Sequence, residues 1–305
     1  MTGRQLEIDQ VSKRYGETVA LDDITFEVRA GEIFGLVGSN GAGKTTAMRI
    51  VLGVLEADAG SVRWDGSSLN LDTRRRIGYM PEERGLYPRM RVGEQLAYLA
   101  QLHGLSPAEA RKASDAWTER LGVADRRTDD VIKLSLGNQQ RVQLGAALVH
   151  DPEILVLDEP FSGLDPVAVD VMSAVLRERA GAGVPVMFSS HQLDLVERLC
   201  DRVGIVRQGR IVAAGTVDEL RAGGRDELVV RAPGAPPGWA SSLPSVTVLD
   251  VSGDATRLAL ADGADDQVVL QAALATGPVH EFAHVRPSLT DLFRHLVGAD
   301  AAEVS

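Results

Sequence analysis

Hydrophobic residues in the first two thirds of the chain form short uninterrupted runs separated by segments with helical spacing. The runs at residues 32–37, 154–157 and 185–188 have the composition of strands that are buried on both faces. Residues 44–54, which follow the first run, have the apolar spacing of a helix. Strands that alternate with helices predict an open α/β sheet with mostly parallel strands.

A helical insertion interrupts this alternation. The apolar positions between residues 92 and 125 follow helical spacing, which predicts a helical subdomain over about residues 84–145. Later in the chain we expect a helix over about residues 191–200 with Ser190 as its N-cap, and a hairpin over residues 204–212. The positions that define the insertion are Leu96, Leu99, Ala100, Leu102, Ala113, Ala116 and Leu121.

The clearest break in the chain is rich in glycine and proline. It begins near Gly223 and Gly224 and continues to Gly238. We therefore expect one domain over residues 1–222 and a small α+β domain over residues 225–305. The elements predicted in the second domain are strands at 246–251 and 256–260, a helix at 267–275, and a helix that begins at Ser288 with Asp291 three residues later.

Composition limits the possible functions. Hydrophobic residues make up 44% and charged residues 25% of the 305, as in ordinary globular proteins. The net charge of −11 disfavours a generally basic surface, so we expect no nucleic-acid partner. The single cysteine, Cys200, cannot form a disulfide within the chain. No apolar stretch reaches the roughly 18 residues of a membrane span, so we expect any membrane part to come from another chain.

Residues 38–45 match the phosphate-binding loop pattern in full, between a predicted strand and a predicted helix. Glycines let the backbone amides point at phosphate oxygens, and the helix N-terminus adds positive partial charge. A glycine-rich turn that contains lysine by chance is disfavoured by this context. We expect Lys44 to reach the β- and γ-phosphates of a nucleotide and the Thr45 hydroxyl to ligate Mg²⁺. The candidate nucleotide-binding residues are Ser39, Asn40, Gly41, Ala42, Gly43, Lys44, Thr45 and Thr46.

Two acids end the second apolar run. In an open α/β sheet, ligands lie at the carboxyl ends of the strands, which is where Asp158 and Glu159 are expected. Asp158 can hold Mg²⁺, and Glu159 can act as a general base on water. The alternative is a pair of solvated acids in a turn, which the presence of the phosphate-binding loop disfavours.

The ordered set of motifs over about residues 5–220 resembles the ATP-binding subunit of an ATP-binding cassette (ABC) transporter. Residues 134–141 resemble the signature sequence of that family, and residues 162–165 resemble the loop after its catalytic acid. His191 resembles the switch histidine, and Tyr15 stands where the family places an aromatic ring on adenine.

The resemblance implies an α/β P-loop NTPase fold with a helical insertion, and a site shared between two subunits. ATP and Mg²⁺ would bind to the phosphate loop of one chain, and the signature of the other chain would contact the nucleotide. A homodimer is the simplest arrangement, since the chain has one motif of each kind, and a heterodimer stays open. The implied catalytic residues are Lys44, Glu159 and His191, and the residues implied to act in trans are Ser135, Gly137 and Asn138.

Two positions depart from the family pattern. Glu82 stands where glutamine is usual; a carboxylate oxygen can also ligate Mg²⁺, which makes Thr45, Glu82 and Asp158 the expected metal set. Within the signature, Leu136 replaces a glycine and Asn138 replaces a glutamine. Because Ser135 and Gly137 remain, we expect the signature to keep its function.

The function implied is an ATP-hydrolysing subunit that powers transport through a separate permease, at the cytoplasmic side of the membrane. Residues 287–293 resemble the end of a small domain carried by some bacterial exporter ATPases, which favours export. The permease is expected beside Glu82, Arg84, Gly85, Leu86 and Tyr87. The alternatives are a soluble ABC-type ATPase acting on ribosomes or nucleic acid, and a nucleotide kinase, which would not need residues 134–141 or His191.

Overall fold

The computed structural model describes residues 4–83, 85–222, 227–261, 263–285 and 288–298. Arg84, Gly223, Gly224 and Pro287, to which expectations were attached above, lie outside these residues. The chain forms two compact units, residues 1–216 and 217–305, and each is described by itself.

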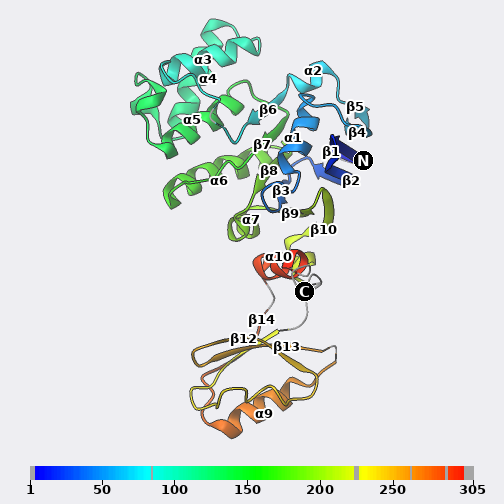
Figure 1. Ribbon diagram of the computed structural model, residues 1–305. Helices are drawn as coiled ribbons and strands as arrows, with labels where there is room; N and C mark the ends of the chain where they lie inside the picture. Colours follow the sequence, from blue (N-terminus) through cyan, green and yellow to red (C-terminus); the bar gives the residue numbers. More distant parts are fainter. Residues whose placement is uncertain (1–3, 84, 223–226, 262, 286–287, 299–305) are drawn as a thin grey trace. The chain divides into compact units, whose positions relative to one another are not determined.

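A six-stranded sheet forms the centre of the first unit (Figure 1). Its strand order is β10-β9-β3-β8-β7-β6, and all neighbours pair in parallel except β9 and β10. The predicted α/β sheet with mostly parallel strands is therefore confirmed. The strands are β3 (Ile33–Val37), β6 (Ile77–Met80), β7 (Ile154–Leu157), β8 (Val186–Ser190), β9 (Arg202–Arg207) and β10 (Arg210–Thr216).

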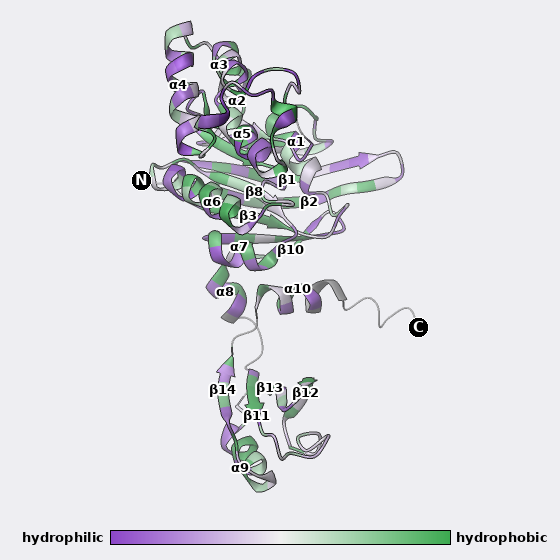
Figure 2. Ribbon diagram, turned by 90° about the vertical axis from the view of Figure 1, so that its left-hand side faces the viewer, coloured by the Kyte–Doolittle hydropathy of each residue, from purple (hydrophilic) through white to green (hydrophobic). Residues whose placement is uncertain are grey.

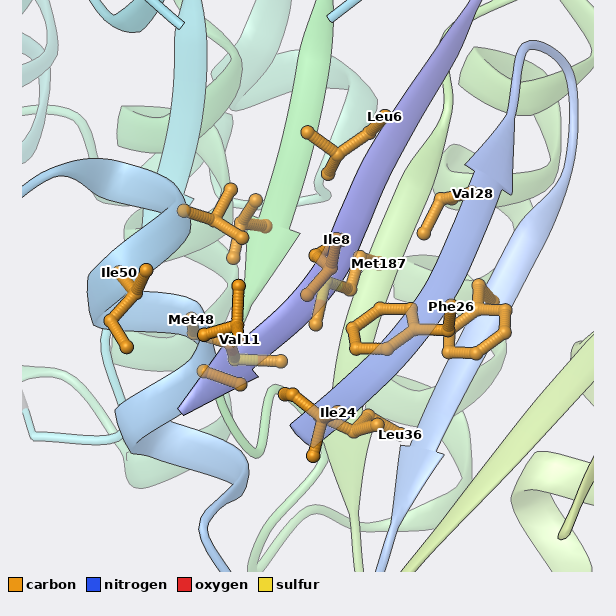
Figure 3. Close-up of a cluster of buried hydrophobic side chains, with 14 of the residues drawn as sticks. Leu6, Ile8, Val11, Ile24, Phe26, Val28, Leu36, Met48, Ile50 and Met187 are labelled. Carbon is orange, nitrogen blue, oxygen red and sulfur yellow. The ribbon is translucent and has the colours of Figure 1, made fainter. Parts of the chain in front are cut away.

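A second, antiparallel sheet with the order β2-β1-β4-β5 was not predicted from the sequence. Its inward side chains and those of α1 (Lys44–Leu52) enclose a core with β3 and β8. Figure 3 shows Leu36 and Met187 from the central sheet facing Ile8, Ile24 and Phe26. The strands are β1 (Gln5–Tyr15), β2 (Thr18–Arg29), β4 (Ala59–Trp64) and β5 (Ser67–Ser68).

The predicted helical insertion is present as a group of three helices at one end of the unit (Figure 1). They are α3 (Val92–Leu102), α4 (Pro107–Arg120) and α5 (Leu136–Leu148), with short 3₁₀ turns at Ala124–Arg126 and Val131–Lys133. The other helices are α2 (Leu71–Arg74), α6 (Pro166–Gly181) and α7 (Leu193–Leu199).

The buried face of α4 differs from the one that apolar spacing predicted. Ala116 is exposed, and the buried residues are Ala110, Ser114 and Thr118, four positions apart. The two hydroxyls can be buried because Ser114 Oγ donates to Gly93 O at 2.9 Å and Thr118 Oγ1 donates to Ser114 O at 2.9 Å. Hydrogen bonds thus let two polar side chains join Ala110 on the buried face of α4, a mostly hydrophilic helix (Figure 2).

Two further local predictions have different outcomes. The prediction that Ser190 caps a helix was wrong: Ser190 ends β8, and Gln192 occupies the N-cap position of α7. The Ser190 hydroxyl instead accepts a hydrogen bond from the Gln192 N–H at 3.0 Å, which shapes the turn before the helix. The predicted hairpin is confirmed as β9 and β10, joined by Gln208 and Gly209 with φ of 48° and 79°.

The second unit contains an antiparallel sheet with the order β12-β13-β11-β14, on which α9 packs. The capping box predicted at Ser288, before α10, is confirmed. The Asp291 N–H donates to Ser288 Oγ and the Ser288 N–H donates to Asp291 Oδ2, both at 3.1 Å. Helix α8 contacts α10 and therefore groups with this unit. The domain boundary predicted from the sequence, at residues 222–225, lies after α8 and stays a prediction. The elements are α8 (Val217–Ala222), β11 (Glu227–Arg231), β12 (Val246–Ser252), β13 (Ala255–Leu260), α9 (Asp266–Thr276), β14 (Glu281–Val285) and α10 (Leu289–Gly298).

A stacked histidine pair joins the helical insertion to the central sheet region. The rings of His103, after α3, and His150, after α5, lie 3.7 Å apart at 14°. His103 Nδ1 is 3.1 Å from the carbonyl oxygen of Arg75. Burial, with a smaller contribution from His103, lowers the pKa of His150 from 6.5 to about 4.

This shift predicts acid sensitivity of the first unit. As the pH falls, His150 is protonated near pH 6.5 in the unfolded chain but only near pH 4 in the folded chain. The contribution of neutral His150 to the free energy of unfolding is therefore fully present above pH 6.5 and is lost between pH 6.5 and 4. The loss amounts to at most about 3.5 kcal/mol at about 1.4 kcal/mol per pKa unit. His150→Phe keeps a ring in the stack and should remove this part of the pH dependence, measured by urea unfolding between pH 7.5 and 4. The exposed-site control His280→Phe should keep the wild-type profile, and parallel profiles for all three proteins would contradict the assignment.

Candidate functional site

The loop between β3 and α1 is built as the sequence predicted. Gly43 occupies the N-cap of α1 with φ 109°. A Cβ at this position would lie 2.5 Å from the carbonyl oxygen of Ala20, so only glycine fits there. Residues 40–46 turn along one wall of a pocket, and Lys44 begins the helix.

This pocket brings together residues from distant parts of the sequence. The carboxyl ends of parallel strands meet at one edge of a sheet, so the segments that follow β3, β6 and β7 converge there. The pocket is lined by Ala20, Asn40, Gly41, Ala42, Gly43, Lys44, Thr45, Thr46, Glu82, Asp158 and Glu159.

Lys44 lies against the loop that precedes it. Its side chain is 7% exposed, and Nζ donates to the carbonyl oxygens of Gly38 at 2.7 Å and Ser39 at 3.2 Å. Nζ is also 3.8 Å from Glu159 Oε1. The ammonium group is thus desolvated but paired, which a buried charge requires.

Ser189 organises the two acids that follow β7. Its hydroxyl donates to Asp158 Oδ1 at 2.6 Å and accepts from the Glu159 N–H at 2.8 Å. Glu159 has φ 48°, a left-handed conformation that is costly for a residue with a side chain and is found most often at functional sites. The Glu159 carboxylate also forms a hydrogen bond to His191 Nδ1 at 2.9 Å through Oε2. Glu159, His191 and Lys44 therefore form one connected group.

The expected metal set shares this pocket. Thr45, Glu82 and Asp158 all line it and supply hydroxyl and carboxylate oxygens, the donors that Mg²⁺ prefers. Burial, with the negative charges of Asp158 and Glu82, raises the pKa of the neighbouring Tyr79. Within the described part of the chain, no group of three or more His, Cys, Asp or Glu side chains is placed to hold a metal ion.

The remaining predicted residues lie elsewhere. Tyr15 ends β1, is 49% exposed and is not part of the pocket wall formed by the described residues. Ser135 is the N-cap of α5, and its hydroxyl accepts from the Asn138 N–H at 3.4 Å. No described residue of α5 lines the pocket, so Gly137 and Asn138 are also outside it. The roles predicted for these residues stay predictions.

Sequence reasoning missed two residues of the site. Ala20, from β2, forms part of the pocket wall, and nothing in its sequence context pointed to it. Ser189 could have been noticed as one of two polar residues that end an apolar strand, directly before His191.

Comparison with known proteins gives consistent matches over both units. Residues 21–162 match the family model "ABC transporter", and residues 215–297 match "ATP-binding protein DrrA1-3-like, C-terminal domain". An uncharacterized ABC transporter ATP-binding protein of Bacillus subtilis, YhaQ, is 38% identical over 96% of this chain and 99% of its own length. The Nod factor export ATP-binding protein I of Burkholderia thailandensis is 33% identical over 98% of this chain and 99% of its own.

Solved structures agree with these matches. A structure of an ATP-binding subunit of an ABC transporter, 33% identical in sequence, superimposes with a TM-score of 0.66. The superposition covers 71% of this chain and 92% of that one.

The double role of Ser189 leads to a stability prediction. Ser189→Ala would leave the buried Glu159 N–H without its acceptor, and the free energy of unfolding should fall by about 1–3 kcal/mol. A suitable control is Ser173→Ala, since Ser173 is also buried but its hydroxyl has no hydrogen-bond partner among the described residues. Urea unfolding should show little change for the control. Equal losses in both variants would mean that the hydrogen bonds of Ser189 do not stabilise the fold.

Proposed function

The chain belongs to the family of ABC transporter ATP-binding proteins, and on that premise we propose that it powers export through a separate membrane permease. It is an ATPase, and its domain binds ATP. The pocket that holds Lys44, Asp158 and Glu159 together at one sheet edge is the observation that carries the proposal. Export is supported by the name of the Nod factor relative and by the match of residues 215–297.

Glu159 is proposed to act as the general base. Its Oε2 is bonded to His191, and Oε1 is buried with no hydrogen-bond partner among the described residues. Such a carboxylate can accept a proton from water and is held in place by the Ser189 bond to its backbone N–H. His191, 52% exposed in its side chain, can orient the carboxylate and contact the terminal phosphate. Lys44 supplies positive charge to the phosphates.

Mg²⁺ is proposed to bind at Thr45, Glu82 and Asp158. These residues alone supply few ligands, so the ion would bind only together with phosphate oxygens of ATP. When bound, it would neutralise charge that develops on the phosphates.

A two-fold dimer, most simply of two identical chains, is proposed as the active form. Ser135 lies at the N-terminus of α5, where backbone N–H groups favour an anion, yet α5 contributes nothing to the pocket wall formed by the described residues. Contact between the signature and the phosphates of the partner subunit's ATP accounts for both facts. Ser39 and Tyr15 are proposed to contact the nucleotide of their own chain.

The permease is proposed to dock near the segment that follows Glu82. Tyr87 and Tyr98 are 52% and 40% exposed there, with ring centroids 6.2 Å apart in an edge-to-face arrangement. Exposed aromatic residues of this kind are typical of protein interfaces. In the described ranges, no helix is long and apolar enough to cross a membrane. The chain would then act at the cytoplasmic face of the membrane, bound to the permease.

The carboxylate at position 82 leads to a prediction about Mg²⁺. Glu82→Gln removes a negative charge from the proposed metal set, so the Mg²⁺ concentration at half-maximal ATPase activity should rise by up to about tenfold. Glu83→Gln is the matched control, because Glu83 is also exposed and does not line the pocket. Identical Mg²⁺ titrations for both variants and wild type would exclude Glu82 as a ligand.

The central prediction concerns Glu159→Gln. The change is nearly isosteric and removes the proposed base, so turnover should fall by about 10²–10⁴-fold while ATP still binds. Unhydrolysed ATP should hold two chains together, so gel filtration should show a dimer with ATP and Mg²⁺ and a monomer without them. A nucleotide kinase would show no such association.

Two results would contradict this proposal separately. Turnover near the wild-type value would show that Glu159 is not the base. A monomer with bound ATP would count against the role of Ser135 in trans. The control is Glu153→Gln, an acid that pairs with Arg76 outside the pocket and should leave turnover unchanged.

A further inference from the structure

Helix α5 carries three glutamines whose side chains are buried. Burying an amide costs free energy unless it is hydrogen-bonded, so each buried glutamine should have a partner. In all three, Nε2 donates to a backbone carbonyl oxygen outside α5. Gln139 donates to Leu134 at 2.9 Å, Gln140 to Pro160 at 3.2 Å, and Gln143 to Pro81 at 2.6 Å and to Glu83 at 3.2 Å.

The two bonds of Gln143 bracket Glu82. They join α5 to a segment about 60 residues earlier in the chain, where residues 81–83 form neither helix nor strand. Because the carbonyl groups on both sides of Glu82 are held by one side chain, the backbone position of Glu82 depends on Gln143. Glu82 itself is exposed and lines the pocket.

The Gln143 amide has an energetic cost as well as its two donated bonds. Gln143 is 3% exposed, and its Oε1 is buried without a hydrogen-bond partner in the part of the chain that the structure describes. An apolar side chain of the same length would avoid the cost of that unpaired oxygen. What an apolar side chain cannot supply is the pair of bonds to Pro81 and Glu83.

The same helix begins at the signature. Ser135 is its N-cap, and Gln143 lies two turns further along the helix. A helix moves as a rigid element over this length, so a displacement of its N-terminus is transmitted to Gln143 and then to the segment around Glu82.

We propose that Gln143 is a positioning residue, which holds Glu82 in the pocket and couples it to the signature segment at the start of α5. The inference rests on the proposed role of Glu82 as a Mg²⁺ ligand. Gln143 acts on the reaction only through Glu82, so its effect must disappear when the Glu82 carboxylate is absent.

The test is a double-mutant cycle between Gln143→Met and Glu82→Ala. Gln143→Met preserves the length of the side chain and removes both donated bonds. Losing one hydrogen bond changes an equilibrium by about fivefold, so losing both should raise the half-saturating Mg²⁺ concentration of the ATPase by about fivefold or more, up to the rise seen in Glu82→Ala. In the Glu82→Ala background, Gln143→Met should change nothing further. ATP affinity without Mg²⁺ should stay at the wild-type value in both single variants.

A second readout does not depend on activity. Without nucleotide, amide hydrogen exchange of the peptide that contains Glu82 and Glu83 should become faster in Gln143→Met, by more than any fall in the melting temperature accounts for. The matched control is Gln101→Met on α3, since Gln101 is exposed and donates to Ala97 O of its own helix. The control should leave exchange and Mg²⁺ dependence unchanged.

The outcomes separate the inference from the function on which it rests. If Glu82→Ala alters the Mg²⁺ dependence and Gln143→Met does not, the inference is wrong and the metal role of Glu82 stands. If the effects of the two changes add, Gln143 acts through another group, and the inference is wrong. If Glu82→Ala itself has no effect on Mg²⁺ dependence, the proposed role of Glu82 fails, and the inference fails with it.

Discussion

The parallel pairing of β3, β8, β7 and β6 is the constraint on which the site depends. Val37 pairs with Ser190, Phe188 with Leu157, and Leu157 with Met80, so the four strands end at one edge of the sheet. The segments that follow β3, β6 and β7 are spread between residues 40 and 159 of the chain, yet they form one pocket. A slip in any one register would move a whole set of side chains away from that edge.

Neutral polar groups hold the charged residues in place. Lys44, Asp158 and Glu159 are all less than 9% exposed, which would be unfavourable for isolated charges. Ser189 bonds both acids, and Lys44 is bonded to the carbonyl groups of its own loop. This arrangement explains how Glu159 can keep a left-handed backbone conformation: the surrounding bonds offset its cost.

The second unit is built around its own core and its own polar bridge. Leu228, Val230 and Leu258 are fully buried between the sheet and α9. Arg257 links the sheet to the start of α10, with bonds of 2.6 Å to Glu227 and 2.7 Å to Asp291. A core of this kind is what allows a segment to fold as a domain, and the match of residues 215–297 to a separate family model agrees with it.

The sequence by itself determined the parallel sheet, the helical insertion and the residues that follow the strand ends, because buried strands and phosphate-binding loops have strong local patterns. It did not determine the antiparallel sheet formed by β1, β2, β4 and β5, because β1 pairs with β4 across a long separation and both β1 and β2 are only partly buried. The buried face of α4 was also decided by tertiary structure, since Ser114 and Thr118 are buried through hydrogen bonds that apolar spacing cannot reveal. The same reason applies to Ser189 and Gln143: each is identified by the partner that it bonds, and that partner is brought near only when the chain has folded.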